Sequence, residues 1–424
     1  MSRPAATPQE TESPYAWLRL LVSLLLMTIG GSGMYSVTVV LPRIQADFAV
    51  DRGAASLPYT LTMVGFGVGG VLMGKLSDRF GVVVPVMLGA FGLGAGFIAA
   101  GSAATLWQFS LAQGVLIGLL GTSATFAPLV ADTSQWFDRR RGIAVAVCMS
   151  GNYVAGAVWP PVMQHFIDSV GWRSTYLGMG VFCFLSVLPL ALVLRRRPPP
   201  QAPQALAAGS VAPMVGASGQ PLVLGMSAGA VQTLLCIAGV SCCVAMSMPQ
   251  VHIVAYCGDL GFGAARGAEM LSVMLGMGVL SRLASGWISD RIGGLRTLLL
   301  GSVLQGVALL LFLPFDGLAS LYIVSAMFGL FQGGIVPSYA LIVREYFSPK
   351  EAGARVGTIL MATLFGMALG GWMSGAVFDL TGSYRAAFLN GIGWNLLNIS
   401  IVAFLLLRAR RVPGIAVLRT AGST

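Results

Sequence analysis

One arginine has the character of an anion-binding residue. Arg282 lies in RLASGWISD, inside an apolar stretch (267–289), whereas the acidic residues lie in predicted loops or near the ends of such stretches. A guanidinium carries a planar fork of N–H donors that matches a carboxylate. Asp290 is eight residues away, or about 12 Å along a helix. Helical side chains lean towards the N-terminus, which directs Arg282 towards the middle of the stretch.

Two roles for Arg282 follow from this position. A charge in an apolar stretch needs a partner, and with no acid expected at that depth a bound anion is a natural counter-charge. The alternative is a structural role, in which the guanidinium donates hydrogen bonds to backbone carbonyls. We expect contact with an anionic substrate.

Other polar side chains accompany this arginine. His252, near the end of the apolar stretch 223–256, is a candidate proton carrier because imidazole changes charge near neutral pH. The alternative for His252 is a polar group at the membrane interface. Five further polar residues fall at central depth, where they contact either a ligand or a neighbouring helix: Tyr35, Asn152, Tyr153, Gln332 and Thr363.

A charged phrase occurs twice, as GKLSDRFG from Gly74 and as GWISDRIG from Gly286. Glycine permits a tight turn, and a carboxylate beside it can tie one helix end to a helix N-terminus or to an arginine. We interpret the two copies as a gate whose contacts break when two halves of the molecule rotate; the alternative is a capped, solvated loop. The first copy comprises Gly74, Asp78, Arg79 and Gly81, and the second Gly286, Asp290, Arg291 and Gly293.

An all-α integral membrane fold must position these residues. Hydrophobic residues make up 56% of the 424-residue chain and charged residues 9%, against about 25% charged in soluble domains, which excludes a soluble globular protein. A bilayer core about 30 Å thick takes about 20 apolar residues per helix. Twelve stretches meet this requirement: 17–42, 55–76, 82–102, 106–130, 141–165, 173–194, 223–256, 267–289, 295–315, 317–343, 353–379 and 385–408.

The twelve predicted transmembrane helices form two parallel six-helix repeats, since an even number of crossings gives both copies the same orientation. We predict bundles at 17–194 and 223–408, joined by a Pro-rich cytoplasmic linker (195–222) and flanked by cytoplasmic tails (1–16 and 409–424). Pairs of the form G-x-x-x-G in GVLIGLLG and GMALGGWMSG are typical of closely packed membrane helices.

The net charge of +10 indicates topology. Most of the 25 Lys and Arg residues fall on segments predicted to lie inside; Arg282 is within a span, and five lie outside, namely Arg43, Arg52, Arg173, Arg266 and Arg385. This bias places both termini in the cytoplasm. It makes anionic membrane lipid, and not nucleic acid, the expected partner of the basic span ends. The six cysteines show no metal-ligand or disulfide spacing, and we interpret them as packing residues.

In these features the chain resembles the major facilitator superfamily of secondary transporters. The family's signature between spans two and three is G-x-L-(A/S)-D-R-x-G-(R/K), which Gly74 to Gly81 match, although the following GVVVP lacks the usual basic residues. The resemblance implies the major facilitator fold, with two bundles that expose a central site to each side of the membrane in turn. It also implies that this loop holds the inner gate shut in the outward-open state.

Within that family the chain resembles the monocarboxylate and oxalate/formate branch, through WFDRRRGIAVAVCMSG, HIVAYCGDLG and RLASGWISD. The resemblance implies that Arg282 binds a substrate carboxylate. Thr363 stands where the oxalate transporter has a second cation, and Gly278 where animal carriers have an aspartate. Ser110 stands where proton-coupled drug exporters carry an arginine, and SGNYVAGAVWPP departs from their G-P-x-x-G pattern. We therefore expect a substrate with one carboxylate.

The predicted function is secondary active transport of a small organic monoanion in the cell membrane, as a multi-pass monomer. Proton coupling, as symport or antiport, and anion exchange both stay open. The main alternative is a drug or metabolite efflux transporter on the same fold, and a further one is a membrane sensor without flux. We do not expect an enzyme, because the sequence contains no deep acid/base pair, metal cluster or nucleophile set, and we expect no cofactor.

Overall fold

The computed structural model describes residues 12–137, 140–196, 214–215 and 221–411, and the predicted tails and linker lie largely outside them. Within these described residues, twelve helical segments are long and apolar enough to cross a membrane, in agreement with the prediction. The first six are Pro14–Asp47, Arg52–Phe80, Val83–Gly101, Leu106–Trp136, Arg141–Val170 and Trp172–Val193. The last six are Ala228–Asp259, Ala264–Ile292, Gly294–Leu311, Leu318–Tyr346, Glu351–Thr381 and Tyr384–Arg410.

Several spans are divided into shorter elements. The N-terminal half contains α1 (Pro14–Gly30), α2 (Ser32–Asp47), α3 (Arg52–Ala55), α4 (Leu57–Phe80), α5 (Val83–Gly101), α6 (Leu106–Leu111), the π-helix η1 (Ala112–Thr122), α7 (Ala127–Trp136), α8 (Arg141–Val170) and α9 (Trp172–Val193). The C-terminal half contains α10 (Ala228–Asp259), α11 (Ala264–Ile292), α12 (Gly294–Leu311), α13 (Leu318–Gln332), α14 (Ile335–Tyr346), α15 (Pro349–Thr381) and α16 (Tyr384–Arg411). Three short strands precede α10 and pair antiparallel in chain order: β1 (Met214–Val215), β2 (Pro221–Val223) and β3 (Met226–Ser227).

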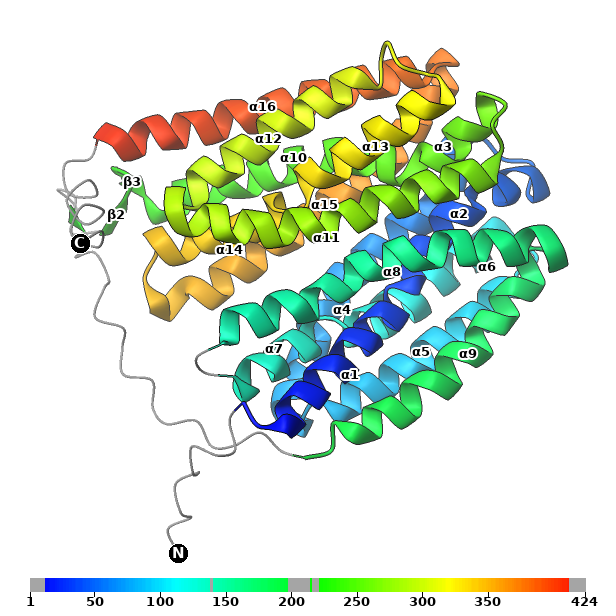
Figure 1. The fold of residues 1–424 in the computed structure, drawn as a ribbon, viewed down its shortest axis with the longest axis horizontal. Coiled ribbons are helices and arrows are strands. Elements are labelled where there is room, and N and C mark those ends of the chain that lie inside the picture. The colour runs from blue at the N-terminus through cyan, green and yellow to red at the C-terminus, as the bar shows by residue number, and fades with distance from the viewer. Residues whose placement is uncertain (1–11, 138–139, 197–213, 216–220, 412–424) are drawn as a thin grey trace, which may run out of the picture.

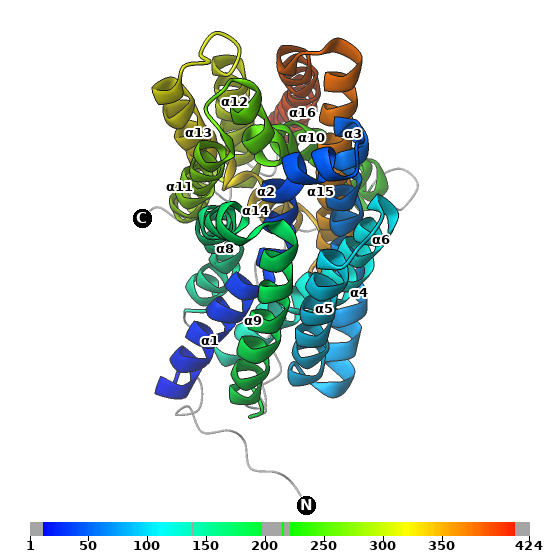
Figure 2. The same ribbon diagram turned by 90° about the vertical axis from the view of Figure 1, so that its right-hand side faces the viewer.

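The two halves form separate groups of helices, with α2, α3, α4, α8, α10, α11 and α15 at their join (Figures 1 and 2). Small residues allow close packing, as predicted for the G-x-x-x-G pairs. A Cβ added to Gly366 or Gly370 on α15 would lie 2.5 Å from the backbone oxygen of Val240 or Val244 on α10. Gly118 on η1 packs equally closely against the backbone of Thr62 on α4. Any larger side chain would push these helices apart.

We call the end of the molecule at which α1 begins and α16 ends the termini end, and the opposite end the distal end (Figure 1). Towards the distal end the halves touch closely: Thr60 on α4 donates to the carbonyl of Ala368 on α15. At mid-depth Gly67 still faces Leu364. Towards the termini end the two halves diverge (Figure 1), and a Cβ added to any of these glycines on α4, α8, α11 and α15 would meet no described atom of another helix within 4 Å: Gly74, Gly142, Gly286 and Gly357.

We expected the repeated charged phrase to form loops. Its two copies instead form the last turns of two helices. Helix α4 continues to Phe80 and α11 to Ile292. Only the final glycine of each copy makes the turn: Gly81 and Gly293 both have φ of 83°, a conformation that favours glycine. Gly74 and Gly286 lie within helices, and our assignment of Gly74 to the turn was wrong.

Candidate functional site

Arg282, on α11, contacts helix α8 of the other half. Its Nη1 donates to the carbonyl oxygen of Met149 at 3.0 Å, and its guanidinium carbon lies 4.4 Å from the ring centroid of Tyr153. The side chain is half-buried, and Nε is buried without a hydrogen-bond partner among the described residues. A structural bond to a carbonyl is therefore present, and donor capacity remains for a ligand.

Two aromatic side chains interact with this arginine, and a third lies close to one of them. Tyr35 on α2 lies within electrostatic reach of Tyr59 on α4, of Tyr153 and of Arg282. All three tyrosines are buried. Gly278, one turn before Arg282, makes room for Tyr153: an added Cβ would lie 2.4 Å from the Cδ1 atom of that ring. Together these groups give Arg282 a largely apolar setting with hydroxyl groups close by.

Of the remaining predicted polar residues, one lies near this site and two lie elsewhere. Thr363 on α15 packs against Gly239 and interacts with Cys243, which is itself within electrostatic reach of Tyr153. Gln332 on α13 instead accepts a hydrogen bond from Gln250 at 3.1 Å, and its own Nε2 has no partner within the described part of the chain. Asn152 lies against Gly31 inside the N-terminal half. The structure gives neither Gln332 nor Asn152 a contact with Arg282.

His252 is fully buried, and its partner Tyr384 is the first residue of α16, at the distal end. Its Nε2 lies 2.8 Å from the carbonyl oxygen of Gly371, and its Nδ1 lies 3.3 Å from the hydroxyl of Tyr384. A carbonyl only accepts, so Nε2 carries the hydrogen and Nδ1 accepts from Tyr384. Both ring nitrogens are therefore engaged in this state.

Arg282 is not the only cation enclosed by the helices, which corrects our expectation. Arg19 on α1 is 2% exposed and forms a two-pronged ion pair with Asp132 on α7, at 2.8 and 2.7 Å. Arg19 also donates to the carbonyls of Leu194 and Arg196. Arg19 and Asp132 both lie near the ends of predicted spans, where we expected water to solvate their charges.

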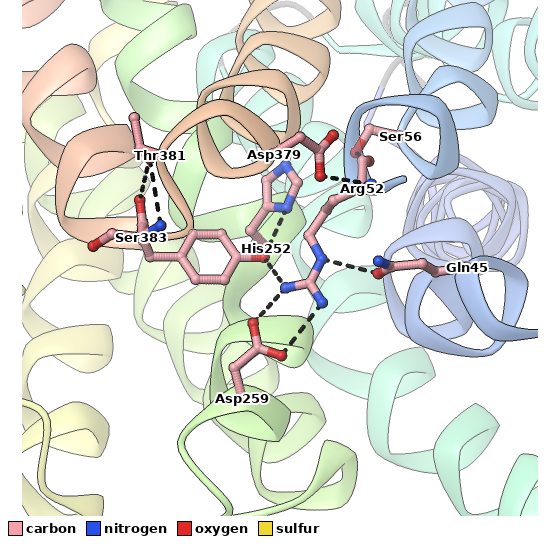
Figure 3. Close-up of polar contacts among 9 residues, drawn as sticks. Gln45, Arg52, Ser56, His252, Asp259, Asp379, Thr381 and Ser383 are labelled. Atoms are coloured by element: carbon pink, nitrogen blue, oxygen red, sulfur yellow. Dashed lines mark hydrogen bonds and ion pairs between the residues drawn. The ribbon is translucent and has the colours of Figure 1, made fainter. Parts of the chain in front are cut away.

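Arg52 is a further buried cation; it lies at the distal end and joins the two halves (Figure 3). It donates to Gln45 of its own half and to Asp259 and Tyr384 of the other. Sequence reasoning counted Arg52 only as an outside basic residue. Acids at the corresponding ends of spans seven and eleven, Asp259 and Asp379, were the signal that could have found this network.

Comparison with known proteins decides the family. The sequence matches the profile of the Major Facilitator Superfamily over residues 21–319 and 235–421. The chain belongs to this superfamily. It is a multi-pass membrane transporter and not an enzyme.

The chain is similar to named transporters within the superfamily. Monocarboxylate transporter 13 of Bos taurus is 28% identical over 344 residues, covering 79% of this chain and 75% of the relative. The MFS transporter asaE of Aspergillus flavus is 26% identical over 315 residues, covering 74% and 68%. Among solved structures, a bacterial homologue of the human lysosomal transporter Spinster, inward-facing and unoccupied, has a TM-score of 0.66 at 14% identity, covering 94% of this chain and 96% of the other. That likeness shows the fold.

The two aspartates of the superfamily signature are exposed in this transporter. Asp78 and Asp290 make no ion pair or side-chain hydrogen bond with any described residue. They lie at the termini end, where the two halves diverge. The gate contacts expected of these residues are therefore not formed in this state, whereas the distal end is closed.

Proposed function

We propose that this transporter moves a small organic monoanion by alternating access, with Arg282 as the anion contact. The observation that carries the proposal is a contrast between Arg282, which lies within a span, and the two buried arginines. Arg19 and Arg52 each have an aspartate partner, whereas Arg282 has none in the part of the chain that the structure describes. An enclosed guanidinium without an acid is the natural partner of a substrate carboxylate.

Three further features support the substrate class. Tyr153, which stacks on the guanidinium, and the neighbouring Tyr35 provide aromatic surface for a small organic body beside the charge. One enclosed cation without a carboxylate compensates one negative charge, so a second carboxylate would enter uncompensated. The name of the relative from Bos taurus, a monocarboxylate transporter, agrees with this chemistry.

The proposed cycle uses the two ends of the molecule in turn. We place the termini end in the cytoplasm, because most Lys and Arg residues lie on segments at that end. The closed distal end and the diverging termini end then correspond to a state open to the cytoplasm. In the opposite state Asp78 and Asp290 would regain partners and close the inner side. Thr363 adds a polar contact near the site, whereas Asn152 and Gln332 serve helix packing.

We propose a structural role for His252 in place of proton transfer. Its buried ring links Gly371 to Tyr384, and this state leaves no ring nitrogen free for a transported proton. Coupling of the substrate to a proton or to a counter-anion is therefore assigned to no residue.

A thermal-shift screen of the purified transporter tests the substrate class. Monocarboxylates, dicarboxylates and cationic dyes are compared for native protein and for Arg282→Ala. We expect stabilisation by monocarboxylates that the substitution abolishes, because a ligand that binds only the folded state raises its stability. Stabilisation by dyes alone, unchanged in Arg282→Ala, would favour the efflux alternative.

A further inference from the structure

We propose that Arg52 is the latch that closes the distal end of this transporter, and that its release from the C-terminal half is the step that opens the substrate site to that side. The proposal rests on alternating access as set out above. It concerns Arg52, which no sequence motif singled out, and Asp259, which lies within HIVAYCGDLG, and it needs no knowledge of the substrate.

The guanidinium of Arg52 uses its donors across the join of the halves (Figure 3). Nη1 and Nη2 donate to the two carboxylate oxygens of Asp259 at the end of α10. Nη1 also donates to the hydroxyl of Tyr384 on α16 at 2.8 Å, while Nε donates to Gln45 on α2 at 2.9 Å. Arg52 is 8% exposed, so these partners have replaced most of its water. Only Gln45 belongs to the same half.

The backbone at the same place is bound to the other half as well. The carboxylate of Asp379 on α15 accepts from the backbone N–H of Arg52 at 2.9 Å and from that of Gly53 at 2.6 Å. This approach depends on small residues. A Cβ added to Gly375 would lie 2.8 Å from the backbone oxygen of Arg52, and neither backbone could yield without separating α3 from α15.

Every bond from Arg52 to the C-terminal half must break if the halves separate at this end. A matched ion pair shows the difference: Arg43 and Asp168 also lie at the distal end, but both belong to the N-terminal half. Their pair survives any rigid rotation of one half against the other. The Arg52 network therefore favours one state of the transporter, whereas the Arg43 pair favours neither.

The network is also suited to opening repeatedly. The Asp259 side chain is 39% exposed, so water can solvate the carboxylate as the pair separates. A pair of this kind is weaker than a fully enclosed one and is weakened further by salt. The enclosed pair of Arg19 and Asp132, which lies within one half, lacks this access to water. The Arg52–Asp259 pair thus fits a latch that opens, whereas the Arg19–Asp132 pair fits a contact that persists within one half.

Pulsed electron–electron resonance between two spin labels measures the opening directly. Labels are placed at Ala104 in the N-terminal half and Phe315 in the C-terminal half, both exposed at the distal end, on a Cys236→Ser background. We expect native protein to show mainly the short distance. Asp259→Asn and Arg52→Gln should each raise the ratio of long to short distances about tenfold or more, and higher salt should raise it further in native protein.

Two comparisons make the result specific to the latch. The double variant Arg52→Gln/Asp259→Asn should open no further than the more open single variant, because the same interaction is lost in each. The matched control Arg43→Gln should leave the distance distribution unchanged. Additive opening in the double variant, or opening by Arg43→Gln, would show a general loosening of the distal end and would overturn the latch.

Two milder variants cover the case in which loss of a charge prevents folding. Gly375→Ala should open the distal end by steric contact, whereas Gly393→Ala on α16, whose added Cβ meets no described atom within 4 Å, should not. Tyr384→Phe should open it less than Asp259→Asn. Unchanged distances in both Gly375→Ala and Tyr384→Phe would exclude the latch. The thermal-shift screen measures substrate contact at Arg282, whereas the label distances measure the Arg52 network, so loss of the substrate proposal and loss of the latch are separate outcomes.

Discussion

The ring of Tyr153 lies 4.4 Å from the guanidinium of Arg282, although the two residues belong to opposite halves of the transporter. The ring is carried by α8 and the charge by α11. In the proposed cycle, the anion contact is thus positioned by a residue that moves relative to it. Its environment, and with it the affinity for substrate, depends on the state of the molecule.

Arg282→Ala should strongly weaken substrate binding and leave membrane insertion intact. A charged, two-pronged hydrogen bond contributes up to about 3 kcal/mol, so affinity should fall about a hundredfold. Arg282→Lys should also bind poorly, because an ammonium lacks the planar fork. Uptake of a labelled monocarboxylate into proteoliposomes checks both variants. Normal transport by the alanine variant would exclude Arg282 as the contact.

Tyr153 should act through Arg282 and not through its hydroxyl. Tyr153→Phe keeps the ring beneath the guanidinium and should transport nearly normally. Tyr153→Leu removes a cation–π contact of about 1 kcal/mol, which should raise KM about fivefold while kcat changes less. Gly278→Ala should resemble Tyr153→Leu, because its Cβ would lie 2.4 Å from the ring. A large loss in Tyr153→Phe would instead assign the hydroxyl to the substrate.

The number of spans and their division into two halves could be predicted from the sequence. Apolar length is a local signal, and the phrase that begins at Gly74 and again at Gly286 marks the same position in each half of the 424-residue chain. The position of GKLSDRFG could not, since nothing in its composition shows that α4 continues to Phe80 before Gly81 turns the chain. Helix ends at a membrane surface are set by packing and solvation together. Charged and polar residues there are compatible with helix and loop alike.

The pairing of side chains from different helices could not be predicted from the sequence. Arg52 and Asp259 are 207 residues apart, and Arg19 and Asp132 are 113 apart. Apolar periodicity assigns a residue to a depth, but it does not show which helices are neighbours. For that reason Arg52 was interpreted as a topology signal only, and the sequence did not show that α15 and α16 enclose His252.

Asp78→Asn should slow net flux and leave substrate affinity near normal. In this state Asp78 is exposed and has no described partner, so binding from the termini end gains nothing from it. The aspartate is expected to act when the inner side closes, through a carboxylate contact that an amide replaces poorly. Asp290→Asn should have the same effect more mildly. Equilibrium binding and exchange rates, measured side by side, distinguish gating from binding; loss of affinity alone would contradict the gate.

His252→Gln should preserve accumulation driven by a pH gradient, if the native protein shows any. The histidine bridges a carbonyl and a hydroxyl, and a glutamine amide can replace one of these bonds. The measurement is uptake of a labelled monocarboxylate into proteoliposomes with an acidic exterior. Retained downhill exchange together with lost gradient-driven accumulation would contradict the structural role and restore His252 as a proton carrier.

Singly charged acids should bind more tightly than dicarboxylates of similar size. Arg282 has no described acidic partner and compensates one carboxylate, whereas a second carboxylate must leave water without a counter-charge, at several kcal/mol. Thr363→Lys offers a direct comparison, because Thr363 lies on α15 and reaches this site through Cys243. A second cation there should improve dicarboxylate affinity relative to monocarboxylate affinity, and Thr363→Gln serves as the uncharged control of similar length. Competition against a labelled monocarboxylate measures both ratios. Tighter binding of a dicarboxylate by the native protein would show that a further cation reaches the site and would overturn the charge argument.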